Sequence, residues 1–178
     1  AHNDAVGIAQ RHGITVSAAC GVIAAISPGC AWGLNVQYAD TLVAAYVQGK
    51  RGRSLPCVGS YGWNNIRKCE HILDGINPLD VLSPKTGPKT RAFYILILNP
   101  SDAVTVCIDR HAKAVAVGRV GSDSDGSNVV RPAQYVFFAR HYQKVALDLG
   151  ITSHQLQAIC WVTWRRVAGN LNQETIPF

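Results

Sequence analysis

The sequence predicts an all-α protein with about seven or eight helices joined by short connections. Apolar residues recur at intervals of three and four in several stretches, which is typical of helices that bury one face. Many glycines fall at the ends of these stretches, where a residue without a side chain readily ends a helix. Only Val104–Ile108 has the β-branched composition of a strand.

Helix boundaries follow from capping residues, prolines and glycines. Thr15 is placed to cap a helix that is apolar on nearly every side, and we expect this helix at the centre of the domain. Asn77 and Pro78 begin a single helical turn that reaches Leu82, and Ser153 is placed to cap the last helix. The expected helices cover residues 4–11, 16–26, 34–48, 63–73, 89–98, 110–117, 132–149 and 153–167.

Residues 50–61 and 121–128 are polar and rich in glycine, and both are expected to be loops. The second loop, GSDSDGSN, lacks the ligand ladder and the closing glutamate of a calcium-binding EF-hand, so we predict no metal there. The tail from 169 to 178 is expected to be irregular.

The composition is that of one globular domain. The chain has 178 residues, of which 48% are hydrophobic and 16% are charged, so it can bury a core and is not a disordered chain. We therefore expect a single domain over residues 1–178. No apolar run is long enough for a transmembrane helix, and no signal peptide is visible, so we expect a cytoplasmic or nucleoid-associated protein without a membrane partner.

The net charge of +6 is compatible with an anionic partner such as nucleic acid, although a plain solvated surface also explains it. Basic residues group at 50–53, 85–91, 110–113 and 165–166. The six cysteines form no C-x-x-C pair, and no Cys/His cluster has the spacing of zinc ligands. We expect reduced thiols, mostly in the core, and no metal.

The stretch from Ser83 to His111 carries the most specific pattern of the chain. A turn punctuated by proline and glycine at 84–88 precedes a helix that begins at Lys89, and Asp109 follows twenty residues later. A turn between two helices directs backbone N–H groups and a helix N-terminus outward, which suits a phosphate. Lys89 also fits a solvated lysine at a helix start, and Asp109 can cap the helix that follows it.

This stretch resembles the hairpin of the helix-hairpin-helix DNA glycosylase superfamily, which contains endonuclease III, adenine glycosylase and 8-oxoguanine glycosylase. Residues 83–91, SPKTGPKTR, lie over the family pattern L-P-G-[VIL]-G-x-K-T-A, and residues 108–111, IDRH, lie over V-D-x-H. The segments 25–35 and 65–69 are similar to two flanking family patterns. The resemblance covers about residues 16–168, with the hairpin at about 80–98, and implies a compact helical glycosylase-like fold.

The chain departs from this superfamily in four ways, one of which is Pro28, near the position where many members have a pocket or wedge glutamine. Lys85 stands in place of the first hairpin glycine, and Pro88 removes one N–H group that a phosphate would meet. The four-cysteine loop that holds an iron–sulfur cluster in endonuclease III is missing, so we predict no cluster and no cofactor.

The resemblance implies that Lys89 is the nucleophile and that Asp109 is its carboxylate partner. A carboxylate beneath the sugar stabilises the positive charge that develops when the N-glycosidic bond breaks, and an amine that attacks C1′ forms a Schiff base. The residues implied to bind DNA are Lys85, Thr86, Gly87, Thr90, Arg91 and Arg110, with Gly87 also expected to serve the turn.

A glycosylase must also turn the target base out of the stack and hold it in a pocket. The candidates for this pocket are Ser27, Trp32, Asn35, His111, Gln157 and Trp161. The spacing of Trp161 on an apolar helix favours a place in the core, whereas His111 fits a core position or a helix end as well as a site.

We therefore expect a monomeric DNA glycosylase with AP lyase activity that excises a damaged or modified base. Two alternatives remain open. One is a glycosylase-fold enzyme of DNA base hypermodification, and the other is a non-catalytic module that grips DNA phosphates through the hairpin.

Overall fold

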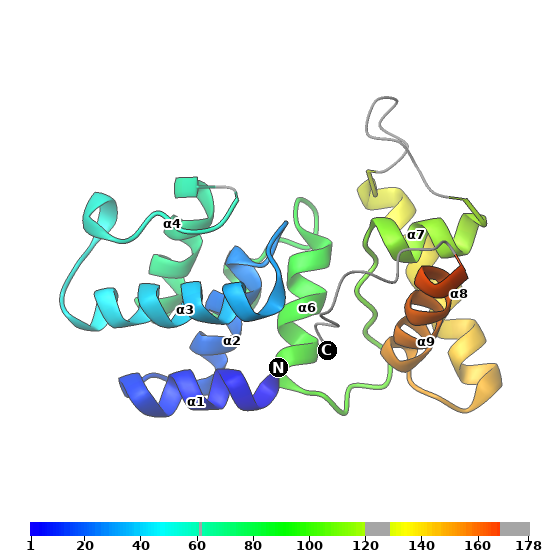
Figure 1. Ribbon diagram of the computed structural model, residues 1–178, viewed down its shortest axis with the longest axis horizontal. Coiled ribbons are helices and arrows are strands. Elements are labelled where there is room, and N and C mark those ends of the chain that lie inside the picture. Colours follow the sequence, from blue (N-terminus) through cyan, green and yellow to red (C-terminus); the bar gives the residue numbers. More distant parts are fainter. Residues whose placement is uncertain (61, 120–128, 168–178) are drawn as a thin grey trace. The chain divides into compact units, whose positions relative to one another are not determined.

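The computed structural model describes residues 1–60, 62–119 and 129–167, which form nine α-helices without a strand (Figure 1). The fold class is all-α, as predicted. The chain divides into two compact units, one over residues 1–100 and one from Ser101 onward. A single domain over residues 1–178 stays a prediction. The expected loop at 121–128 and the expected irregular tail at 169–178 lie outside the described residues.

The helix boundaries of the first unit agree with the sequence prediction to within two residues. The elements are α1 (His2–His12), α2 (Val16–Ile26), α3 (Trp32–Val47), the 3-10 helix η1 (Gly52–Ser54), α4 (Gly62–Leu73), α5 (Pro78–Val81) and α6 (Pro88–Leu98). Thr15 caps α2 as predicted, because its side chain accepts a hydrogen bond from the Ala18 N–H at 3.1 Å. The short helix η1 lies inside the stretch that was expected to be a plain loop.

Helix α2 is the centre of the first unit, as expected from its apolar sequence. Every residue from Ala19 to Ile26 is buried, and α2 packs against all five other α-helices of the unit (Figure 1). Gly21 allows the closest of these contacts, since a Cβ atom there would lie 3.1 Å from side-chain atoms of Ile72 in α4 and Pro78 in α5.

Two of the cysteines lie in this core. Cys20 and Cys69 are fully buried, and burial raises the pKa of each thiol to about 12. Both are therefore protonated thiols at neutral pH and pack as small apolar groups. All six cysteines are free.

The second unit contains three helices, α7 (Arg110–Val117), α8 (Pro132–Leu149) and α9 (Ser153–Val167). Helix α9 packs against both α7 and α8. Gly118 and Gly150 end α7 and α8 in the left-handed conformation, with φ values of 70° and 67°.

The prediction that Ser153 caps α9 is wrong by one residue. The hydroxyl of Thr152 accepts from the Gln155 N–H at 3.3 Å, and the Gln155 side chain accepts from the Thr152 N–H at 3.0 Å, which is a capping box. Ser153 is the first residue of the helix, and its hydroxyl donates to the carbonyl oxygen of Ala103 at 3.2 Å.

The strand expected at Val104–Ile108 is absent among the described residues. The segment is extended. The N–H groups of Val104 and Thr105 donate to the side chain of Asp102, and the other bonded backbone groups bind side chains of two helices in place of a neighbouring strand. The partners are Tyr135 and Gln143 of α8 and Gln157 of α9, at 2.8 to 3.4 Å. Buried backbone groups need hydrogen-bond partners, and here the helices supply them without a sheet.

Candidate functional site

The turn between α5 and α6 is closed by Ser83. Its hydroxyl oxygen accepts hydrogen bonds from the N–H groups of Lys85 and Thr86, both at 3.2 Å, and its carbonyl oxygen accepts from the Gly87 N–H at 3.0 Å. The expectation that the N–H groups of this turn point outward to a phosphate is therefore wrong for these three. A phosphate at the turn must be bound by side chains and by the first turn of α6.

Gly87 has a backbone conformation that does not require glycine. Its φ is −144°, outside the left-handed region, and a Cβ atom there would lie 3.7 Å from the carbonyl oxygen of Ser83, in ordinary contact. The turn requirement predicted for Gly87 is not found in the structure.

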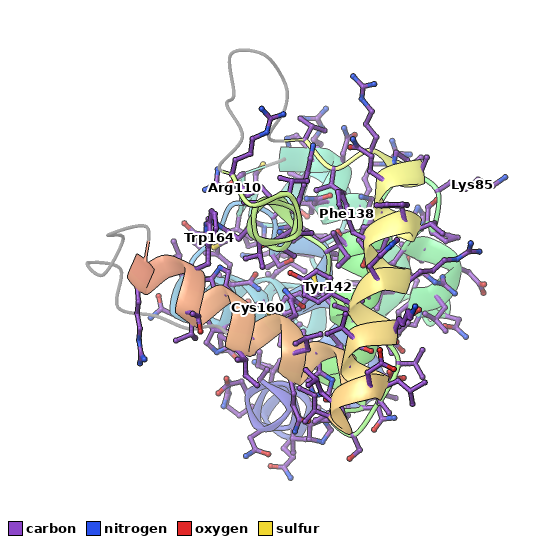
Figure 2. The ribbon with its side chains drawn as sticks, turned by 90° about the vertical axis from the view of Figure 1, so that its right-hand side faces the viewer. Lys85, Arg110, Phe138, Tyr142, Cys160 and Trp164 are labelled. Atoms are coloured by element: carbon purple, nitrogen blue, oxygen red, sulfur yellow. The ribbon has the colours of Figure 1, made fainter. Side chains whose placement is uncertain are left out.

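Two lysines lie exposed around the N-terminus of α6. Lys85 is in the turn and extends away from the ribbon (Figure 2), and Lys89 is the second residue of the helix. Thr86 is exposed as well, and Thr90 is half-buried. The N-terminus of a helix already carries a partial positive charge, so two cations there raise the local positive potential. An anion at this place would relieve that repulsion.

Arg91 points into the protein and not toward solvent. Its Nη1 atom donates to the carbonyl oxygens of Leu79 and Leu82, the latter at 3.2 Å, and the residue is half-buried. These carbonyls belong to the end of α5, so Arg91 joins α5 to α6. Arg91 thus has a structural role, and its contact with DNA stays a prediction.

Trp32 joins three helices of the first unit. Its indole N–H donates to Asp4 of α1 at 3.0 Å, and its ring meets Phe93 of α6 edge to face at 6.1 Å between centroids. The structure therefore places this predicted pocket residue beside α6, the helix that carries Lys89 near its start.

The side chains of Ser27 and Asn35 both bind backbone carbonyl oxygens at the C-terminal end of α2. The Ser27 N–H and hydroxyl bind the carbonyl oxygen of Ala24, which leaves the carbonyl of Ile23 without its usual partner in the helix. The Asn35 side-chain amide, only 1% exposed, donates to that carbonyl at 3.1 Å. Among the described residues its Oδ1 atom has no hydrogen-bond partner. The sequence signal for this role is an asparagine on an apolar helix face.

In the second unit, Asp109 caps α7, as the sequence allowed. Its Oδ1 atom accepts from the N–H groups of His111 at 3.0 Å and Ala112 at 2.8 Å. The carboxylate is half-buried, so it keeps a path to solvent.

His111 brings together three other predicted site residues. Its ring meets Trp161 of α9 edge to face, with centroids 6.2 Å apart, and Nε of the exposed Arg110 donates to its Nε2 at 3.4 Å. With Asp109 next to it in the chain, this cluster gathers a carboxylate, a guanidinium, an imidazole and an indole at the start of α7.

Gln157 lies deeper, with 5% of its surface exposed. Its Oε1 atom accepts from the Cys107 N–H at 3.2 Å, so it binds the backbone two residues before Asp109. Its position supports the segment that carries Asp109, and its predicted role in reading a base stays a prediction.

Two buried tyrosines of α8 near Asp109 were missed by the sequence prediction. Burial raises the pKa of both Tyr135 and Tyr142, and the charge of Asp109 adds to the shift. Tyr142 donates to the carbonyl oxygen of Ala112 at 3.0 Å, and Figure 2 shows its place on the inner side of α8. A tyrosine repeated after seven residues on one helix face was the available signal.

The predicted site residues thus form two groups, one in each unit. In the first unit the hairpin residues lie at the start of α6, Ser27 and Asn35 lie at the end of α2, and Trp32 contacts Phe93 within α6. In the second unit the predicted residues lie around the start of α7. Lys89 and Asp109 belong to different units, so their meeting stays a prediction.

Two absences among the described residues bear on the class of site. No group of three or more His, Cys, Asp and Glu side chains is arranged to hold a metal ion. In the same part of the chain, no helix combines the length and the apolar character needed to cross a membrane.

Comparison with known proteins gives one family. Neither the curated proteins nor the solved structures contain a match. The resemblance to DNA glycosylases therefore stays a prediction. One family model, described as a family of unknown function (DUF7178), matches residues 1–168, which include every residue of the two groups. The chain belongs to the DUF7178 family.

Proposed function

We propose that this protein is a DNA glycosylase with AP lyase activity, in which Lys89 is the nucleophile and Asp109 the stabilising carboxylate. The observation that carries the proposal is the pair of exposed lysines, Lys85 and Lys89, at the positive end of α6. A backbone phosphate bound by Lys85 would bring the neighbouring sugar to the Lys89 amine.

The chemistry follows from these two groups. The Lys89 amine forms a bond to C1′ while the N-glycosidic bond breaks, and the base leaves with the bonding electron pair. Opening of the sugar ring gives a Schiff base, and the ring oxygen takes a proton from water. In the β-elimination that follows, water removes a proton from C2′ while the bond between C3′ and the phosphate oxygen breaks and the phosphate leaves with the electron pair. Asp109 stabilises the positive charge on the sugar during the first step.

The half-buried aromatic and polar groups around Asp109 support a base pocket. His111 and Trp161 offer ring edges and faces, and Arg110 offers a cation for the phosphate of the extruded nucleotide. We further propose that the protein acts as a monomer in the cytoplasm or on the nucleoid, since its free thiols suit a reducing compartment.

Borohydride trapping on a duplex with an abasic site tests the enzyme directly. We expect a covalent adduct with the natural protein and none with Lys89→Gln. Lys85→Gln is the matched control, because it removes a charge from the same helix end and should weaken binding without abolishing the adduct. A natural protein that forms no adduct at saturating DNA would refute the lyase assignment.

A non-catalytic DNA-binding module is the second candidate. Asp109 already has a complete structural role as the cap of α7, which favours this alternative. This alternative predicts DNA binding that weakens steeply with salt, does not depend on base sequence and is unchanged in Asp109→Asn. It also predicts no base release from any duplex in a panel in which each duplex contains one damaged base.

A further inference from the structure

Helix α8 has two faces of different character. The inner face carries the buried residues Tyr135, Phe138, Tyr142 and Ala146. Figure 2 shows Phe138 and Tyr142 on this side of the helix. The opposite face carries Phe137, Arg140, His141 and Lys144, which are all exposed and follow the helical spacing of three and four. We call these four residues the α8 ridge.

The ridge holds an aromatic ring in the open. Phe137 is 56% exposed, although phenylalanine side chains are usually buried in the core. Its ring lies 4.3 Å from the His141 ring between centroids, and the Nδ1 atom of His141 bonds to the Phe137 carbonyl oxygen at 2.8 Å. Two neighbouring rings are thus held in place before any partner binds.

The cations of the ridge are not neutralised by carboxylates. Among the described residues, neither Arg140 nor Lys144 takes part in an ion pair or a hydrogen bond, and Asp148, one turn beyond Lys144, does not pair with it. Over residues 101–174 the unit has eight lysines and arginines against five aspartates and one glutamate, a net charge of +2. The two unpaired cations of the ridge therefore favour an anionic partner.

An exposed ring flanked by unpaired cations suits single-stranded nucleic acid. Bases stack on aromatic faces regardless of sequence, while lysine and arginine bind the phosphates between them. An acidic peptide would satisfy Arg140 and Lys144 but would leave the ring of Phe137 without a matching partner. The combination therefore favours a strand with unpaired bases.

We propose that the α8 ridge binds single-stranded DNA, with a base stacked on Phe137 and phosphates at Arg140 and Lys144. The inference rests on the proposed function in taking DNA as the ligand, but it uses none of the residues proposed for catalysis. A glycosylase that extrudes a base must unpair the duplex locally, and a surface for the unpaired strand fits that need.

Fluorescence anisotropy with a labelled oligothymidylate of about 16 nucleotides tests the ridge. We expect Phe137→Ala to weaken binding roughly 5- to 150-fold, the loss that corresponds to one stacked base. Phe137→Tyr keeps the ring and should bind as the natural protein does. Leu147→Ala is the matched control for lost apolar surface, since Leu147 is 79% exposed on the same helix outside the ridge.

An oligonucleotide of the same length that has phosphates but no bases separates stacking from charge. Phe137→Ala should leave its affinity unchanged. The double change of Arg140→Gln and Lys144→Gln should reduce the salt dependence of binding to both probes, by about 0.7 in slope for each charge. Arg67→Gln in α4, which removes an exposed cation from the first unit, serves as the charge control.

Equal losses for Phe137→Ala and Leu147→Ala would overturn the proposal, as would an unchanged salt slope in the double variant. Polyglutamate binding as tight as that of the oligothymidylate would show an acidic protein partner and also overturn it. None of these outcomes would affect the borohydride adduct of Lys89, so the ridge proposal can fail while the proposed enzyme activity stands. If no borohydride adduct forms but oligothymidylate binding still depends on Phe137, the proposed enzyme activity is refuted and the α8 ridge proposal stands.

Discussion

The side-chain oxygen of Gln157 accepts a hydrogen bond from the backbone N–H of Cys107 at 3.2 Å, and this bond joins α9 to the segment that leads into Asp109. The segment has no neighbouring strand among the described residues, and side chains of α8 and α9 provide most of its hydrogen-bond partners. The position of the Asp109 carboxylate thus depends on side chains that come much later in the chain.

Gln157→Leu should therefore destabilise the second unit. The change keeps the size of the side chain but removes the acceptor for the Cys107 N–H, and we expect a loss of about 1–3 kcal/mol in the free energy of unfolding. Urea denaturation followed by circular dichroism measures it. Thr163→Ala, an exposed change on the same helix, should cost much less; equal losses would contradict the assigned role.

Substitutions at Asp109 separate capping from catalysis. Asparagine caps a helix about as well as aspartate, so Asp109→Asn should preserve the stability of α7 but remove the negative charge that the proposed reaction needs. Asp109→Ala should lose both, at a cost of about 1 kcal/mol in stability. Thermal denaturation and base-release assays on the same samples distinguish the two effects. Full activity in the asparagine variant would exclude a catalytic charge.

Arg91→Gln should destabilise the first unit, because its guanidinium binds the carbonyl oxygens of Leu79 and Leu82 at the end of α5. Hydrogen bonds from a charged donor contribute about 1.5–3 kcal/mol, and we expect a loss of that order in urea denaturation. Lys85→Gln should leave stability unchanged, since Lys85 is exposed. If both variants unfold at the same urea concentration as the natural protein, the hydrogen bonds of Arg91 do not stabilise the fold.

Acid should weaken the contact between α1 and α3. Burial tends to raise the pKa of the Asp40 carboxyl, but hydrogen bonds and charges from Arg11 and His12 outweigh it and hold that pKa below its ordinary value. The resulting stability is present above the unfolded pKa of about 3.9 and is lost as the pH falls through the lower folded value.

Asp40→Asn should remove this contribution. The carboxylate is 39% exposed, so we expect a difference of only about 0.2–1 kcal/mol at neutral pH. Urea denaturation of the natural protein and the variant at a series of pH values measures it. The two stabilities should converge as the pH falls below the lowered pKa of Asp40 in the folded protein. A difference that persists there would show that Asp40 acts through something other than its charge.

The helices could be predicted from the sequence because their limits depend on neighbouring residues. Thr15 and Asp109 cap the helices that follow them, and each bond spans three residues or fewer. The capping error at Ser153 is of the same local kind. Thr152 and Ser153 are equivalent by residue type, and the carbonyl of Ala103, distant in the chain, takes the Ser153 hydroxyl.

The candidate site was harder to predict because its side chains are shared between local and distant partners. The sequence marks Arg91 and Asn35 as polar groups near a motif, but the structure uses them to bind carbonyl oxygens of other helices. The basic residues of the hairpin also differ in exposure. Lys85 and Lys89 remain at the surface, whereas Arg91 turns inward.

By itself the sequence determined the all-α class, the central place of α2 and most helix ends, since apolar spacing and capping act within a few residues. Only the tertiary structure decided how the chain from Val104 to Ile108 is held and where the stretch from Ser83 to His111 divides. That stretch, continuous in sequence, begins in one unit and ends in the other. The physical reason is that an extended backbone forms its hydrogen bonds with the groups that pack beside it. Here most of those partners are side chains of α8 and α9, which are distant in the chain.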